Sequence, residues 1–178
     1  MAWLKSVARR TATLTLVGLF MCASGVAAKK PANKEIFGWL EKVEVGSSRL
    51  DLIAKLDTGA DTSSLDARGL RRYRRESGPW AEFTVKSAAS GRQIKMRKRI
   101  LREARIKVHD GAPQERPVVG IAVCLGTHLM EIEVTLVDRS EFEYPVLLGR
   151  NALRDISLID PSRSYSSEPK CAREESEE

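Results

Sequence analysis

The sequence contains few of the residues that bind metal ions or nucleotides. Histidine occurs only at His109 and His128, and there are three cysteines. There is no His-Glu-x-x-His motif and no cysteine pair spaced for zinc. There is also no glycine-rich loop ending in Lys-Ser or Lys-Thr, which an ATP-binding loop requires. The sequence therefore gives no basis for a metal site or an ATP site, and we expect no cofactor.

Long apolar runs are absent except at the N-terminus. There, a basic head precedes a largely apolar stretch over residues 11–25, and small residues follow up to Ala28. This order is typical of a secretory signal peptide, and the stretch is too short for a comfortable membrane span. We therefore expect cleavage of residues 1–28, a periplasmic or secreted mature chain, and no stable membrane insertion after cleavage.

Two other interpretations of this leader fit less well. A twin-arginine export signal would use Arg9 and Arg10, but the residues around the pair match poorly. A lipoprotein would be modified at Cys22, but the bulky Met21 before it argues against lipidation. An ordinary cleavable signal peptide remains the preferred interpretation.

The mature chain would be long enough for one domain with a substantial core. Its formal charge would be +3, because the leader carries three of the positive charges in the total of +6. Cys124 and Cys171 would remain and could form a disulfide in an oxidising compartment. However, Cys124 falls in a strand-like run and Cys171 in a polar tail, which argues against this pairing.

Apolar and polar residues alternate in several segments, which indicates β-strands. Segments 82–86 and 93–97 predict one hairpin. Segments 119–125 and 130–136 predict a stronger one around Gly126-Thr127, since glycine first in a two-residue connection suits a type II′ turn.

A third strand pair is expected over 36–45 and 50–56, and only 150–155 is expected to be helical at any length. Short strands, regular turns and almost no helix indicate an all-β barrel or sandwich. The expected boundaries are a signal peptide over 1–28, a linker over 29–35, a domain over 36–165 and a disordered acidic tail over 166–178.

One segment carries candidate catalytic chemistry. An apolar strand ends in Asp57-Thr58-Gly59-Ala60, which alone would be an ordinary turn. Much farther along, the chain contains Leu147-Leu148-Gly149-Arg150. Together these motifs resemble those of the retroviral aspartic proteases. Further features match a related bacterial family: Gly38-Trp39, Thr62 to Leu65, Asp160-Pro161 and Ser164-Tyr165.

With these features, the span from Ile36 to Tyr165 more closely resembles a bacterial retropepsin-like aspartic peptidase family. Its members are often labelled ATP-dependent zinc proteases, and some are encoded beside glutamate ligases. The resemblance implies an all-β, retropepsin-like acid-protease barrel with one short C-terminal helix.

The resemblance also implies a role for each matching residue. Asp57 would be the catalytic carboxylate, in a loop completed by Ala60. The hydroxyl of Thr58 would hold two active-site loops together, and Gly59 would permit a tight backbone and close approach of substrate. The remaining roles are structural: Leu148 and Gly149 would support the loop from beneath, and Arg150 would pair with Asp61.

Aspartic peptidases require two carboxylates so close that both cannot ionise, so the pair shares a proton and activates water. This chain contains no second Asp-Thr-Gly or Asp-Ser-Gly segment and no internal repeat. The second Asp57 would therefore come from another subunit across a two-fold axis. We expect a homodimeric aspartic endopeptidase. The alternative is a non-catalytic module of the same fold that binds a peptide or a partner protein in the periplasm.

The substrate would be a peptide or protein. Basic residues cluster over 68–75 and 92–107, but Tyr73 is the single aromatic residue among them, and the leader indicates export. We therefore expect no nucleic-acid partner. A solvated strand face is the simpler explanation, and attraction of an acidic substrate is another. Two segments are candidates for a substrate-covering flap: the turn 87–91 and the loop 109–117.

Overall fold

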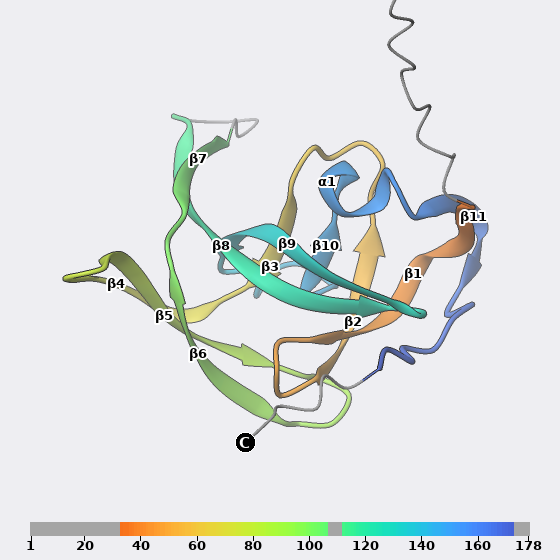
Figure 1. The fold of residues 1–178 in the computed structure, drawn as a ribbon, viewed down its shortest axis with the longest axis horizontal. Helices are drawn as coiled ribbons and strands as arrows, with labels where there is room; N and C mark the ends of the chain where they lie inside the picture. Colours follow the sequence, from red (N-terminus) through yellow and green to blue (C-terminus); the bar gives the residue numbers. More distant parts are fainter. Residues whose placement is uncertain (1–32, 107–111, 173–178) are drawn as a thin grey trace, which may run out of the picture. The chain divides into compact units, whose positions relative to one another are not determined.

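A computed structural model describes residues 33–106 and 112–172. The expected signal peptide and most of the expected linker lie outside these residues. The described chain forms eleven strands and one short helix, arranged in two sheets (Figure 1). The elements are β1 (Glu35–Val45), β2 (Leu50–Leu56), β3 (Ser63–Asp66), β4 (Arg68–Arg75), β5 (Gly78–Lys86), β6 (Gln93–Arg99), β7 (Arg102–Ile106), β8 (Gln114–Leu125), β9 (His128–Val137), β10 (Val146–Leu148), α1 (Arg150–Leu153) and β11 (Ser157–Ser164).

The three predicted strand pairs are confirmed as antiparallel hairpins. β1 pairs with β2, β5 with β6, and β8 with β9. In the last hairpin Leu125 lies opposite His128, so the connection is the two residues that the alternation predicted. Gly126 has a φ of +56°, a left-handed conformation that glycine adopts without a steric penalty.

The larger sheet has eight strands in the order β11-β1-β2-β10-β3-β9-β8-β7, and an additional pairing of β1 with β8 joins distant parts of that order. Six strands therefore form a closed barrel, in the order β1, β2, β10, β3, β9 and β8, which confirms the all-β, retropepsin-like fold. Apolar side chains that alternate along these strands fill its interior. Fully buried examples are Phe37, Val43, Leu50, Ile121, Leu125, Leu136 and Leu148.

The smaller sheet contains β4, β5 and β6 in that order. One face packs on the core through Ala81, Phe83, Val85 and Met96, all buried. The end of this sheet where β4 meets β5 projects from the barrel, at the left of Figure 1. The helix expected over 150–155 is present as α1, four residues long. No helix within the described ranges has the length and apolar character needed to cross a membrane.

The expectation of a disordered tail from residue 166 is wrong for residues 166–172. The backbone N–H groups and the hydroxyls of Ser166 and Ser167 all donate to the carboxylate of Glu41, which is fully buried on β1. Farther along, the N–H of Lys170 donates to the carbonyl of Gly126 at 2.7 Å. Composition suggested disorder, but this segment is held by polar contacts to the barrel, which composition does not reveal.

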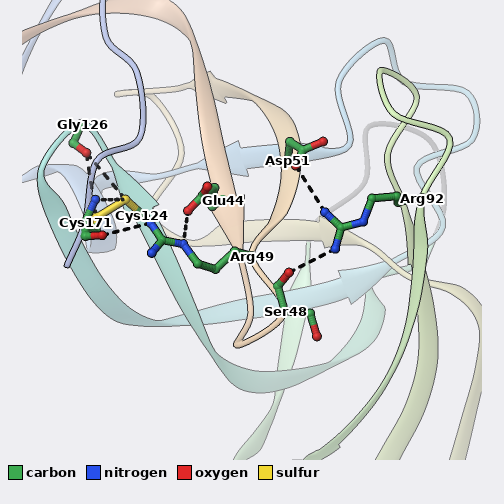
Figure 2. A network of polar contacts seen from close by, with 8 residues as sticks. All are labelled: Glu44, Ser48, Arg49, Asp51, Arg92, Cys124, Gly126 and Cys171. Carbon is green, nitrogen blue, oxygen red and sulfur yellow. Dashed lines mark hydrogen bonds and ion pairs between the residues drawn. A yellow bond between two sulfur atoms is a disulfide. The ribbon is translucent and has the colours of Figure 1, made fainter. Parts of the chain in front are cut away.

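Within this segment Cys171 forms a disulfide with Cys124, where the sequence argued against pairing. Figure 2 shows how the neighbouring side chains support it. Arg49 donates to the carboxylate of Glu44 and, at 3.1 Å, to the carbonyl of Cys171. Arg92 extends from the smaller sheet to Asp51 and to the carbonyl of Ser48. The C-terminal segment is therefore fixed to β8 covalently and to the β1–β2 hairpin by hydrogen bonds.

Candidate active site

Asp57 lies directly after β2, where the strand leaves the barrel wall. Its N–H donates to the carbonyl of Leu148 at 2.8 Å, and Leu148 pairs with Leu56 where β10 runs parallel to β2. Leu148 is fully buried. Two segments far apart in the sequence thus meet at the residue that the motif singled out, and the position of Asp57 is fixed by backbone pairing to the core.

The Asp57 carboxylate is oriented by its own loop and remains accessible. The N–H of Gly59 donates to Asp57 Oδ1 at 2.9 Å, and the side chain is 29% exposed. A Cβ at residue 59 would lie 3.1 Å from that oxygen, so glycine permits the close approach. Lys55 Nζ lies 3.8 Å from Asp57 Oδ2, so a cationic side chain stands beside the carboxylate.

Gly149 lets the second segment pass beneath the loop. A Cβ at this position would lie 2.8 Å from the carbonyl of Thr62 and 2.9 Å from that of Ala60, closer than side chains tolerate. The next residue donates its N–H to the Ala60 carbonyl at 2.9 Å. The glycine therefore permits the contact between the loop and the N-terminus of α1.

Arg150 joins the active-site loop at two points. Its guanidinium donates to the carboxylate of Asp61 and, at 2.8 Å, to the carbonyl of Thr58. Both charged side chains are substantially exposed, so the pair holds the loop in shape and adds little to stability. Thr58 is exposed, and the role expected for its hydroxyl requires a second subunit and stays a prediction.

Two residues to which the sequence analysis assigned no role connect these parts. Ser63 is fully buried; its hydroxyl donates to Asn151 Oδ1 at 2.8 Å and accepts from the N–H of Gly149 at 3.0 Å. The amide of Asn151 in turn donates to the carbonyl of Glu133 on β9, at 2.8 Å. Asn151 directly follows the Gly-Arg motif, which was the available signal. Ser63 lies in the matching segment Thr62 to Leu65, but the match assigned it no role.

Behind the loop, a buried arginine ties the end of β3 to the segment before β10. Arg139 donates to Ser64 Oγ at 2.9 Å and to the carbonyl of Tyr144 at 3.1 Å, and its N–H donates to Asp66 at 2.7 Å. Burial lowers the pKa of Arg139, opposed by the charge of Asp66. The strand that follows the active-site loop is thereby fixed at its far end.

The two flap candidates contact different parts of the barrel. The turn 87–91 borders a hollow with Asp51, Leu52 and Ile53, at the start of β2. Asp57 follows the other end of this strand, and five residues of strand span roughly 17 Å. The base of the β7–β8 hairpin is connected to the site by hydrogen bonds, because Arg102 donates to the carboxylate of Glu133 and the carbonyl of Glu133 accepts from Asn151. Residues 109–111 of the other candidate, the loop 109–117, lie outside the described chain.

The arrangement supplies one oriented, accessible carboxylate per chain. Across 33–106 and 112–172, no group of three or more His, Cys, Asp or Glu side chains is placed to hold a metal ion. A single carboxylate can act as a base toward water. Peptide hydrolysis also needs an acid that donates a proton to the substrate, which requires a second group.

A β-barrel with one Asp-Thr-Gly loop, supported from below by an aliphatic-Gly-Arg segment, defines a single-lobed, retropepsin-like protein. Comparison with known families agrees, because residues 36–170 match the family model described as RimB-like, retropepsin-like aspartic endopeptidase RimB. The chain therefore belongs to this family.

Individual relatives support the assignment. A crystal structure of a Legionella pneumophila protein of unknown function is 32% identical, with a TM-score of 0.66, and covers 77% of this chain and all of its own. A probable alpha-L-glutamate ligase from Shewanella halifaxensis is 36% identical over 63% of this chain, and one from Desulfotalea psychrophila is 29% identical over 72%. The matched segments span about a quarter of those two proteins, 25% and 28% of their lengths.

Proposed function

We propose that this protein is an exported aspartic endopeptidase in which two copies of Asp57, one from each subunit of a homodimer, activate the water that attacks the peptide bond. The observation that carries the proposal is the Asp57 loop. Its carboxylate is accessible, is oriented by the Gly59 N–H and is anchored to the Leu148 carbonyl. Membership of a retropepsin-like family supports a hydrolase.

The chemistry follows from placing two such carboxylates together. They share one proton, so one acts as a base that deprotonates water while the other donates a proton to the carbonyl oxygen of the substrate. The apparent pKa values belong to the pair and not to either residue. Neither subunit alone can supply both functions, which makes dimerisation part of the mechanism.

We further propose that the substrates are acidic peptides. The mature chain carries excess positive charge, and clefts of one sign raise the local concentration of oppositely charged substrates. The relatives named probable alpha-L-glutamate ligases contain a segment similar to this chain, which associates the domain with glutamate chemistry in those proteins.

Export is supported by the leader pattern and by the disulfide between Cys124 and Cys171, since disulfides persist mainly in oxidising compartments. Two measurements on protein recovered from cells test it. The N-terminus should begin near residue 29, and neither cysteine should react with a thiol reagent before reduction. An intact leader together with two free thiols would refute export.

The catalytic proposal is tested by replacing Asp57→Asn and measuring cleavage of a library of acidic peptides at mildly acidic pH. We expect turnover to fall by at least about a thousandfold, because the amide cannot act as a base and the dyad is lost. The matched control is Asp51→Asn, a 54%-exposed carboxylate at the opposite end of the same strand, which should keep wild-type turnover. Unchanged cleavage by Asp57→Asn would exclude Asp57 from the mechanism. No cleavage by the wild type would favour the non-catalytic binding module.

A further inference from the structure

The smaller sheet presents a surface that the proposed active site does not use. Residues directly opposite one another in a sheet share a face. The register of β4, β5 and β6 places Arg71, Glu82 and Arg97 in one row and Tyr73, Trp80 and Arg99 in the next. Arg75 lies over the two aromatic rings, and Lys95 bonds to Glu82. The basic face is defined as Arg71, Tyr73, Arg75, Trp80, Glu82, Lys95, Arg97 and Arg99.

This face keeps a strong positive charge although it contains an acid. Glu82 is 8% exposed and accepts hydrogen bonds from Arg97 at 2.7 Å, Lys95 at 2.9 Å and Arg71 at 2.5 Å. These bonds, that of Arg97 first, lower the pKa of Glu82 to about 2, so it stays ionised at physiological pH. The side chains of its three partners remain exposed, 58% for Arg97, 57% for Lys95 and 74% for Arg71. One carboxylate therefore holds three cations in a common layer, and the five cations exceed the single acid.

The aromatic residues of the face come from two strands: Tyr73 lies among the arginines of β4, and cross-strand register places Trp80 of β5 between Tyr73 and Arg99. The guanidinium carbon of Arg75 lies 4.7 Å from the ring centroid of Trp80 and 5.3 Å from that of Tyr73. The rings thus already carry a cation. Single-stranded nucleic acids bind by stacking bases on free ring faces, so the covered rings disfavour that partner.

The shape of the face favours an extended anionic surface over a peptide. A hollow of about 540 Å³ lies on it, lined by Arg71, Arg72, Tyr73, Arg75, Glu82 and Arg97. None of these lining residues is aliphatic, so the hollow offers no apolar wall to seat a peptide side chain. Neighbouring strands lie roughly 4.8 Å apart and same-face residues roughly 7 Å apart along a strand, so the cations form a two-dimensional array.

We propose that the basic face docks the protein on an anionic phospholipid surface. Guanidinium groups bind phosphate oxygens in a bidentate manner, and tryptophan and tyrosine favour the headgroup level of a membrane. The face lies at the projecting end of the smaller sheet, away from β1 and β11 in Figure 1. The docking does not depend on peptide cleavage, so Asp57→Asn should bind vesicles like the wild type.

The test uses the chain from Lys29, because the described unit has its own core and the leader would itself enter lipid. Vesicles of phosphatidylglycerol and phosphatidylcholine are compared with vesicles of phosphatidylcholine alone in a sedimentation assay. The variant Arg75→Gln/Arg99→Gln removes two exposed cations that do not bond to Glu82. We expect roughly 30-fold weaker partitioning to the anionic vesicles, since each basic residue near such a surface contributes about fivefold. The control Lys34→Gln/Lys170→Gln removes the same charge from exposed positions at the N- and C-terminal ends of the described fold and should change partitioning less than about twofold.

Wild-type binding to the anionic vesicles should also be lost at about 1 M salt, where the Debye length is about 3 Å. Three outcomes would overturn the proposal. The first is no binding to anionic vesicles at low salt, and the second is equal binding to neutral vesicles. The third is unchanged vesicle binding by Arg75→Gln/Arg99→Gln while the same variant loses affinity for poly-L-glutamate or an oligonucleotide, which would assign the face to that polymer. Circular dichroism of both variants checks that the fold is retained.

Discussion

Glu41 is a fully buried acid whose partners come from both ends of the described chain. Its carboxylate accepts hydrogen bonds from the N–H of Gly38 at 2.7 Å and from the N–H groups and hydroxyls of Ser166 and Ser167. Burial acts to raise the pKa of Glu41, but these hydrogen bonds together outweigh it, so the pKa is lowered. The carboxylate therefore stabilises the fold only in its ionised form.

Replacing Glu41→Gln should lower the free energy of unfolding at pH 7 by about 2–3 kcal/mol, because an amide leaves several buried donors unsatisfied. The folded-state pKa lies below the unfolded value of about 4.3. The stabilisation is thus fully present above that pH and is lost as the pH falls below it. Urea unfolding at pH 7 and at pH 3 measures this, and the difference between the two proteins should shrink in acid. Glu82 is present in both proteins, so its titration changes both free energies of unfolding equally and does not affect their difference.

The matched control is Glu168→Gln, a carboxylate that is 55% exposed and pairs with Lys42. Its cost should stay below about 1 kcal/mol, as is usual for surface ion pairs. A difference between Glu41→Gln and wild type that is constant from pH 7 to pH 3 would contradict the account of Glu41.

Single residues of the active site were predictable only where they belong to a motif. Asp57, Gly59, Gly149 and Arg150 stand in two short motifs, and each lies where a specific backbone or side-chain contact requires it. The buried hydroxyl of Ser63 carries no comparable signal, because its importance comes from segments that reach it from far along the chain.

At the scale of elements, the hairpins were predictable because their information is local. Alternation fixes which side chains face the core, and a two-residue turn at Gly126-Thr127 fixes the register. The tail was not predictable. Residues 166–172 are polar, and their order comes from a buried carboxylate on β1 and a cysteine on β8, neither of which is near them in the sequence.

Removing the disulfide should destabilise the fold measurably. Cys124 and Cys171 are separated by 47 residues, and closing a loop of that length lowers the entropy of the unfolded chain by an amount worth about 4 kcal/mol. Denaturant unfolding of Cys124→Ser/Cys171→Ser should show most of this loss, and hydrogen exchange should accelerate over 165–172.

The reduced wild type is the matched control, since it lacks the same bond without a substitution, and it should resemble the double variant. Adding Glu41→Gln to the double variant should cost less than it does in the wild type, because both changes release the same segment. Full additivity of the two effects, or an unchanged unfolding midpoint without the disulfide, would show that the tail is held independently of Cys171.

At the scale of the whole molecule, the barrel class followed from the strand pattern, but its closure did not. The pairing of β1 with β8 and the parallel pairing of β3 with β9 join segments remote in sequence, which local periodicity cannot reveal. The same limit concealed the basic face, because Trp80 on β5 joins the cations of β4 and β6 only through cross-strand register.

The proposed mechanism makes a prediction that belongs to the assembly. If catalysis needs one Asp57 from each of two subunits, a subunit carrying Asp57→Asn should inactivate its wild-type partner. With a ninefold excess of this variant, random exchange across a two-fold interface leaves only about a tenth of the wild-type subunits paired with one another. Cleavage per wild-type subunit should therefore fall roughly tenfold. The same excess of Asp51→Asn should not reduce it, since that carboxylate lies at the far end of β2. If activity per wild-type subunit is unaffected by either variant while light scattering reports mixed dimers, each chain acts alone and the shared dyad is refuted.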